Sequence, residues 1–161
     1  MYKSPVLFFE SETLTAQLQP NTYFVKAAII CDEAYKEQIG QLTNQFYDTP
    51  VETFFYTSVE GVRQFIASQK MGTCFYLLGN WDEAAEIFAT AVSEGVSEEE
   101  IQVQIVGPKR KYIYCMKCFT PSEIDPVAEN VQCGCGAHLN VGPFYSKVRK
   151  GYIGYPFIPE N

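Results

Sequence analysis

Four of the six cysteines in this 161-residue chain form two close pairs near its C-terminal end. The first pair, Cys115 and Cys118, is separated by two residues, and the second, Cys133 and Cys135, by one. About fourteen residues lie between the pairs. Two short-spaced pairs on separate turns bring four thiolates to one point, as a tetrahedral metal ion requires. The sequence therefore predicts a four-cysteine metal centre that organises this part of the fold.

Zinc is the expected metal, because a closed site of four thiolates typically stabilises a segment too small for a core of its own. Residues 109–145 are such a segment. The spacing does not distinguish zinc from iron in a rubredoxin-like centre or a cluster, and a redox-active dithiol or metal-free thiols also stay open. His138, the one histidine, is an alternative ligand, but we expect it to be exposed on a strand. Gly134 and Gly136 supply the backbone freedom that the tight second pair needs.

The composition changes after Gly107-Pro108, which predicts two domains, residues 1–108 and 109–161. The second has the two-knuckle, three-stranded pattern of a zinc ribbon, with its last strand at residues 138–141. An aromatic tail follows, and it contains Phe144, Tyr145, Tyr152, Tyr155 and Phe157.

Strand and helix patterns alternate in the first domain, which predicts a small parallel sheet with helices on both faces. The predicted strands are residues 23–31, 51–56, 74–78 and 101–106. The predicted helices begin after capping residues Asp32 and Ser58 and at Trp81, and the first extends to about Tyr47. Residues 1–20 are expected to form an arm on a neighbouring element, with a short strand at residues 6–9.

Ligands of parallel sheets bind at the carboxyl ends of the strands. Here the first of these ends has no glycine, and it places Asp32 and Glu33 where a pyrophosphate would bind. Their negative charge repels phosphate, so the fold is predicted to be degenerate as a nucleotide-binding domain, with no cofactor-binding residues.

The charge is divided unevenly along the chain. Residues 1–108 contain five Lys or Arg and fifteen Asp or Glu, whereas residues 109–161 contain seven and four. The acidic first part argues against nucleic acid as the partner. The basic residues after Pro108 are compatible with an acidic protein partner or with a simply solvated face. No apolar run reaches the roughly 18–20 residues of a membrane helix, and no signal peptide is recognisable, so we expect a cytoplasmic protein.

No catalytic residues are predicted. Cys31 and Cys74 lie in apolar strand patterns, as buried structural thiols do. A single histidine leaves no Ser-His-Asp or Cys-His-Asn arrangement in this chain. Carboxylate chemistry by Asp32-Glu33 or by residues 98–100 stays open, although such acidic runs are usually solvated.

Two segments resemble known families. Residues 75–107 (FYLLGNWDEAAEIFATAVSEGVSEEEIQVQIVG) resemble the end of the nucleotide-binding half of ferredoxin-reductase-like flavoproteins, with Leu78-Gly79-Asn80 in place of that family's Cys-Gly-Pro. The stretch KYIYCMKC…VQCGCGAHLNVGPFYSKVRKGYIGYP looks like the cysteine-rich end of the DmmA-like subunit of dimethylamine monooxygenase. This second resemblance departs from its family at the Cys-x-Cys knuckle and at residues 142–145.

The DmmA-like resemblance implies a subunit of a multicomponent NAD(P)H-dependent monooxygenase that converts dimethylamine to methylamine and formaldehyde. Haem, flavin and iron–sulfur groups would then lie on partner subunits, and this chain would have a structural or docking role. Two alternatives remain at this point: a free-standing zinc-ribbon interaction module, and a degenerate NAD(P)H or flavin reductase module.

Overall fold

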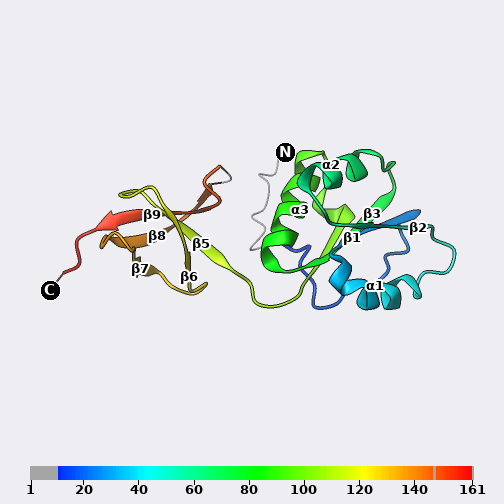
Figure 1. Cartoon of the computed structure of the whole chain (residues 1–161), viewed down its shortest axis with the longest axis horizontal. Helices are drawn as coiled ribbons and strands as arrows, with labels where there is room; N and C mark the ends of the chain where they lie inside the picture. Colours follow the sequence, from blue (N-terminus) through cyan, green and yellow to red (C-terminus); the bar gives the residue numbers. More distant parts are fainter. Residues whose placement is uncertain (1–10, 147, 161) are drawn as a thin grey trace. The chain divides into compact units, whose positions relative to one another are not determined.

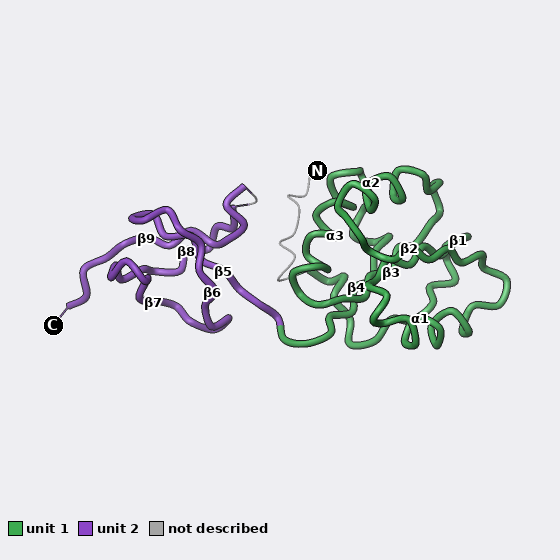
Figure 2. The backbone as a smooth tube through the Cα atoms, viewed as in Figure 1, with its two compact units in different colours: residues 1–108 green, residues 109–161 purple. Residues whose placement is uncertain are grey.

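The structure is a computed structural model, and it describes residues 11–146 and 148–160. The chain divides into two compact units, residues 1–108 (unit 1) and residues 109–161 (unit 2), shown in Figure 2. The net charge along the sequence changes sign at the same boundary. Each unit is built around a sheet of its own. No helix among the described residues has the length and apolar character needed to cross a membrane.

Unit 1 is an α/β fold (Figure 1). Its four-stranded parallel sheet has the order β2-β1-β3-β4. This confirms the predicted parallel sheet. The elements follow along the chain as β1 (Lys26–Cys31), the 3-10 helix η2 (Glu33–Tyr35), α1 (Lys36–Thr43), β2 (Val51–Phe55), α2 (Val59–Ala67), β3 (Thr73–Gly79), α3 (Trp81–Ser93), the 3-10 helix η3 (Glu98–Glu100) and β4 (Ile101–Ile105).

The two central strands of unit 1 are buried on both faces, because helices cover the sheet from both sides. Ile30 and Leu77 pack on one face against α2 and α3. Ile29 and Tyr76 point to the opposite face, where they pack against α1. The predicted helices on both faces are thus confirmed, and β1 and β3 read as unbroken apolar runs for this reason.

The helix after β1 is shorter than predicted. Asp32 caps η2 by accepting a hydrogen bond of 2.8 Å from the backbone N–H of Ala34, and α1 ends at Thr43 instead of near Tyr47. The backbone after α1 forms a tighter turn than an α-helix, because the N–H of Phe46 bonds to the carbonyl of Thr43, three residues back. The Phe46 ring then packs edge-on against Tyr76, with 5.6 Å between the ring centroids.

The N-terminal arm lies along the edge of β4, as expected for part of residues 1–20. Leu14 forms a parallel bridge with Val103, and two backbone hydrogen bonds of 2.8 Å join Val103 to Thr13 and Thr15. Leu18 is buried on the α1 side of the sheet. The short strand predicted at residues 6–9 lies outside the described residues.

Unit 2 is a curled, mixed sheet in the order β6-β5-β9-β8-β7. Its strands are β5 (Lys111–Cys115), β6 (Pro121–Ile124), β7 (Asn130–Gln132), β8 (His138–Ser146) and β9 (Gly151–Phe157). β5 and β9 are parallel and the other pairs are antiparallel.

Unit 2 has more strands than the predicted ribbon. The strand expected to end at Val141 continues to Ser146 past an irregularity between Val141 and Tyr145, and the predicted aromatic tail forms β9, inserted between β5 and β8. A close approach makes this insertion possible: a Cβ on Gly154 would lie 2.8 Å from Ile113 and 3.1 Å from Leu139. Only glycine fits there, since glycine has no side chain beyond its α-carbon.

Candidate metal centre

The first cysteine pair lies on the turn from β5 to β6. Cys115 is the last residue of β5, and the turn closes through a hydrogen bond of 2.8 Å from the N–H of Phe119 to the carbonyl of Cys115. The backbone N–H groups of Lys117 and Cys118 point at the Sγ atom of Cys115, at 3.3 and 3.4 Å. Such hydrogen bonds favour the thiolate form of a cysteine. Phe119 completes the turn with φ at 60°, a left-handed conformation that non-glycine residues rarely adopt.

The second pair lies on the turn from β7 to β8, which is one residue tighter. The N–H of Cys133 bonds to the carbonyl of Ala137, four residues on, whereas the N–H of Cys115 bonds to the carbonyl of Thr120, five residues on. Gly136 takes the left-handed position with φ at 91°. The Cys-x-Cys spacing is therefore matched by a shorter turn, and the turn still delivers both sulfur atoms to one side.

The two turns bring the four cysteines together. The Sγ atoms of Cys118 and Cys133 are 3.6 Å apart, and those of Cys115 and Cys135 are 3.9 Å apart. All four Sγ atoms lie within 4.8 Å of one another. A tetrahedron of sulfur atoms around one ion with Zn–S bonds near 2.3 Å has edges of about 3.8 Å. The four cysteines lie close enough to hold a single metal ion, and the 3.6 and 3.9 Å separations are near that edge length.

The distances between the sulfur atoms also test two alternatives, an iron–sulfur cluster and a histidine ligand. An iron–sulfur cluster places several iron and sulfide atoms between its cysteines, so it needs the sulfur atoms much farther apart than one ion does. His138 does not join the group of converging donor atoms. Its ring instead lies beside Phe157, with 5.9 Å between the ring centroids.

The electrostatics of the centre favour a bound cation. The side chain of Thr120 and the neighbouring thiols of Cys133 and Cys115 lower the pKa of Cys118 to about 6, against the effect of desolvation. A backbone hydrogen bond from Cys135 lowers the pKa of Cys133, but desolvation and the neighbouring sulfur atoms raise it overall to about 11. Four thiols this close cannot all ionise unaided, because each new thiolate repels the next. A divalent cation removes that repulsion.

The cysteines are also part of the core of unit 2. Cys115 and Cys133 are buried together with Ile113, Ala137 and Leu139. Cys135, by contrast, is exposed. A metal ion at this centre would join two turns of the chain and complete a core that contains few large apolar side chains.

The cysteines of unit 1 have a different environment. Cys31 and Cys74 are buried in the central strands. Burial raises the pKa of both thiols to about 11, with a further contribution from Asp32 for Cys31. They are protonated near neutral pH and are poor nucleophiles, in agreement with a structural role.

The acidic runs have structural contacts. Asp32 caps η2, and Glu100 forms a capping box with Ser97. Glu98 accepts a hydrogen bond of 2.8 Å from the hydroxyl of Ser11 in the N-terminal arm. These contacts give Asp32, Glu98 and Glu100 structural roles.

Sequence reasoning missed a tyrosine–carboxylate group near the carboxyl ends of the unit 1 strands. The hydroxyl of Tyr56 donates a hydrogen bond of 2.7 Å to Glu86, and burial together with Glu86 raises the pKa of Tyr56 to about 12. Burial raises the pKa of Glu83, and the charge of Asp32 raises it further. The periodicity of α3 could have indicated that Glu83 and Glu86 share a face of the helix.

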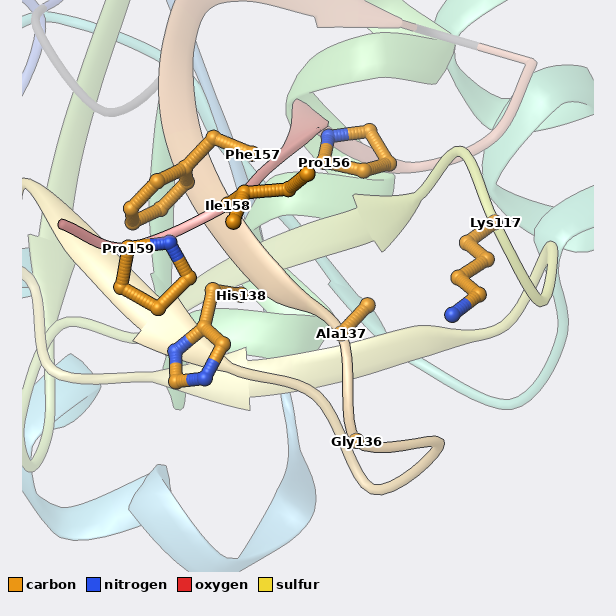
Figure 3. Close-up of a pocket in the computed structure, with 8 residues that line it drawn as sticks. All are labelled: Lys117, Gly136, Ala137, His138, Pro156, Phe157, Ile158 and Pro159. Atoms are coloured by element: carbon orange, nitrogen blue, oxygen red, sulfur yellow. The ribbon is translucent and has the colours of Figure 1, made fainter. Parts of the chain in front are cut away.

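An open cavity of about 400 Å³ lies beside the cysteine turns in unit 2 (Figure 3). It combines apolar and cationic side chains, since Phe157 and Pro159 lie across from Lys117. The other lining residues are Gly136, Ala137, His138, Pro156 and Ile158. Comparisons with protein-family models, curated proteins and solved structures find no match to this chain.

Proposed function

We propose that this chain is a zinc-stabilised docking subunit of a multicomponent NAD(P)H-dependent amine monooxygenase, which converts dimethylamine to methylamine and formaldehyde. The convergence of four cysteine sulfur atoms within 4.8 Å of one another supports a metal-held unit. The DmmA-like pattern around those cysteines supports the oxygenase partner. Haem, flavin and iron–sulfur groups would be carried by partner subunits.

The proposal assigns zinc to this centre, and a single iron ion, which would take the same four thiolates, is the competing assignment that elemental analysis separates. A closed site of four thiolates leaves no coordination position for substrate, so the ion would be structural. The ion would hold two turns whose core contains Cys115 and Cys133 themselves. Elemental analysis of the purified full-length chain should give one zinc per chain and a colourless protein. One iron per chain with visible absorption would contradict the structural assignment and place the chain in the electron-transfer path.

The α/β unit would serve as a scaffold with a nucleotide-binding-like topology and no bound nucleotide. Asp32 follows β1, and Glu83 lies in the first turn of α3 within the electrostatic reach of Asp32. Carboxylates at the carboxyl ends of the strands would repel a phosphate there. Calorimetry with NADPH and with FMN at millimolar concentration should detect no binding to the full chain. Measurable binding of either would favour the reductase alternative.

The catalytic part of the proposal is tested on the assembled protein. A tagged full-length chain should co-purify with stoichiometric partners that carry haem or flavin, and the complex should oxidise NADPH and release formaldehyde when dimethylamine is added. The isolated chain should do neither. If the chain alone turned over dimethylamine, the non-catalytic role would be wrong. A colourless monomer without partners would favour the free-standing zinc-ribbon module.

A further inference from the structure

The sheet of unit 2 has two chemically different faces. Side chains alternate between the faces of a strand, so Ile113, Cys115 and Leu139 share the inner face, which holds the cysteine centre. Their sequence neighbours point to the opposite side, which we call the outer face. The strand residues of the outer face include Tyr112, Tyr114, Pro121, Glu123, His138, Asn140, Ile153, Tyr155 and Phe157.

The outer face is more aromatic than a water-facing sheet usually is. A sheet with one buried and one solvated face normally alternates apolar and polar residues. Here β9 places Ile153, Tyr155 and Phe157 in a row on the outer face, and Tyr155 is 45% exposed. All the regular elements of unit 2 within the described residues are strands of the one sheet. Ile153 and Phe157 are half-buried and Tyr114 is only 6% exposed, so the exposed aromatic surface of this face centres on Tyr155, and β7 adds the polar residues Asn130 and Gln132. An exposed aromatic side chain flanked by half-buried apolar ones is a candidate anchor for a partner.

Cations are fixed on the same face. The guanidinium of Arg110 lies 5.5 Å from the ring centre of Tyr112, and that of Arg149 lies 4.8 Å from the ring centre of Tyr114. Arg149 also donates a hydrogen bond of 2.6 Å to the hydroxyl of Tyr114. Stacking of this kind orders both arginines against the sheet. The charge of Arg110 is paired with Glu123 at 2.7 Å, whereas Arg149 adds a positive charge to the face.

The charge balance of the outer face is positive. Glu123 is the only carboxylate among the described strand residues of this face, and Arg110 binds it at 3.1 and 2.7 Å. The cavity in Figure 3 meets this face only at His138 and Phe157, because its other walls include Pro156 and Ala137 of the inner side and Lys117 of the first cysteine turn, and its lining has no carboxylate. This positive face belongs to a chain whose formal net charge is −7.

We propose that the outer face of unit 2 docks a partner protein through a surface of apolar side chains bordered by carboxylates. This inference rests on the proposed function, since it names the surface by which the subunit would join its complex. Arginine and tyrosine are enriched at protein interfaces, and this face presents Arg149, fixed on Tyr114, and the exposed Tyr155. A cavity of about 400 Å³ with apolar walls and Lys117 at its edge suits one anchoring side chain of the partner beside a carboxylate.

A protein fits better than a nucleic acid. Nucleic-acid binding draws on a sustained basic surface, and its affinity depends on the number of phosphates neutralised. The fifteen carboxylate side chains of residues 1–108, against five cations, would oppose that binding. An acidic protein surface needs complementarity only over the docked patch.

The test uses the full metal-loaded chain and the partner that co-purifies with it, identified by mass spectrometry and then produced separately. Affinity is measured by calorimetry in 50 mM and in 300 mM sodium chloride. We expect Tyr155→Ser and Arg149→Glu each to weaken binding at least tenfold, and the wild-type affinity to fall with salt. Tyr47→Ser is the matched control, since Tyr47 is 96% exposed in unit 1, and it should bind as the wild type does. Metal content and circular dichroism establish that each variant is folded.

Three results would overturn the inference: binding unchanged in both outer-face variants, no stoichiometric protein partner at low salt, or a single-stranded 20-mer DNA that binds the chain and displaces the partner. The inference and the proposed function can fail separately. A partner that binds the outer face but carries no redox group would retain the docking surface and remove the oxygenase. An active oxygenase complex that forms equally well with both variants would retain the proposed function and remove the docking surface.

Discussion

The two units are stabilised by different means. Among its described residues, unit 1 buries thirteen in the cluster under α2 and α3 and nine in the cluster under α1. The corresponding cluster has five of the described residues of unit 2, and two of these, Cys115 and Cys133, belong to the four-cysteine centre. A core of that size contributes little hydrophobic stabilisation by itself. The sheet of unit 1 is therefore stabilised by the helices packed on both of its faces. We expect the sheet of unit 2 to depend on a metal bound by the four cysteines of its two turns.

The largest effect should come from metal removal. Structural zinc contributes on the order of 10–16 kcal/mol of binding free energy to small domains, more than a core of five residues can replace. A chelator should therefore unfold β5 to β9 and leave β1 and β3 intact. Hydrogen exchange read by mass spectrometry measures both units in one sample. Protection of β5 and β9 that survives complete loss of metal would show that unit 2 is stable by itself.

A substitution that creates a cavity in the core of unit 1 should destabilise unit 1 and leave the metal centre of unit 2 unchanged. Leu77 is fully buried between β1 and the helices α2 and α3, so Leu77→Ala should lower the free energy of unfolding of unit 1 by about 3 kcal/mol. The metal content should not change. Denaturant unfolding measures the first quantity and elemental analysis the second. Val25→Ala is the control, since Val25 is 71% exposed, and a comparable loss in that variant would remove the packing explanation.

Thiol reactivity should separate the two sets of cysteines. The pKa of Cys31 and Cys74 is raised from 9.0 to about 11, so their thiolate fraction at pH 8 is about a hundredfold below that of an unperturbed thiol. Their alkylation by iodoacetamide should be correspondingly slow and should rise about tenfold per pH unit until pH 11. After chelation the four cysteines of unit 2 should react first. Peptide mass spectrometry measures the rates, and rapid native-state labelling of Cys74 would contradict the assignment.

The smallest effect concerns the start of α3. The side chain of Asn80 accepts a hydrogen bond of 2.9 Å from the N–H of Glu83, and Asn80→Ala should cost unit 1 about 1 kcal/mol. Asn80→Gly is the matched variant, because glycine also suits this position and costs only a few tenths of that energy. Thermal unfolding distinguishes the two. Equal losses in both variants would indicate that the cap is not the cause.

Local patterns in the sequence were sufficient for much of this fold. The alternation of apolar runs with capped helices predicts the parallel sheet, because each signal lies within a few residues of its consequence. The capping residues are equally local signals, because each accepts a hydrogen bond from a backbone N–H two or three residues on: Asp32, Ser58 and Asn80. The two cysteine pairs likewise predict their own convergence, since Cys115 and Cys118 share one turn and Cys133 and Cys135 share another.

Only the tertiary structure decided the rest of unit 2. The aromatic segment after Ser146 becomes β9 because Gly154 lets it pass between Ile113 and Leu139, a contact between residues far apart in the sequence. The insertion of β9 also assigns Tyr155 and Ile153 to the outer face and Gly154 to the inner one. The residues themselves determine a four-cysteine centre. Which aromatic side chains lie behind it depends on strand pairing, because a shift of one residue would reverse both faces.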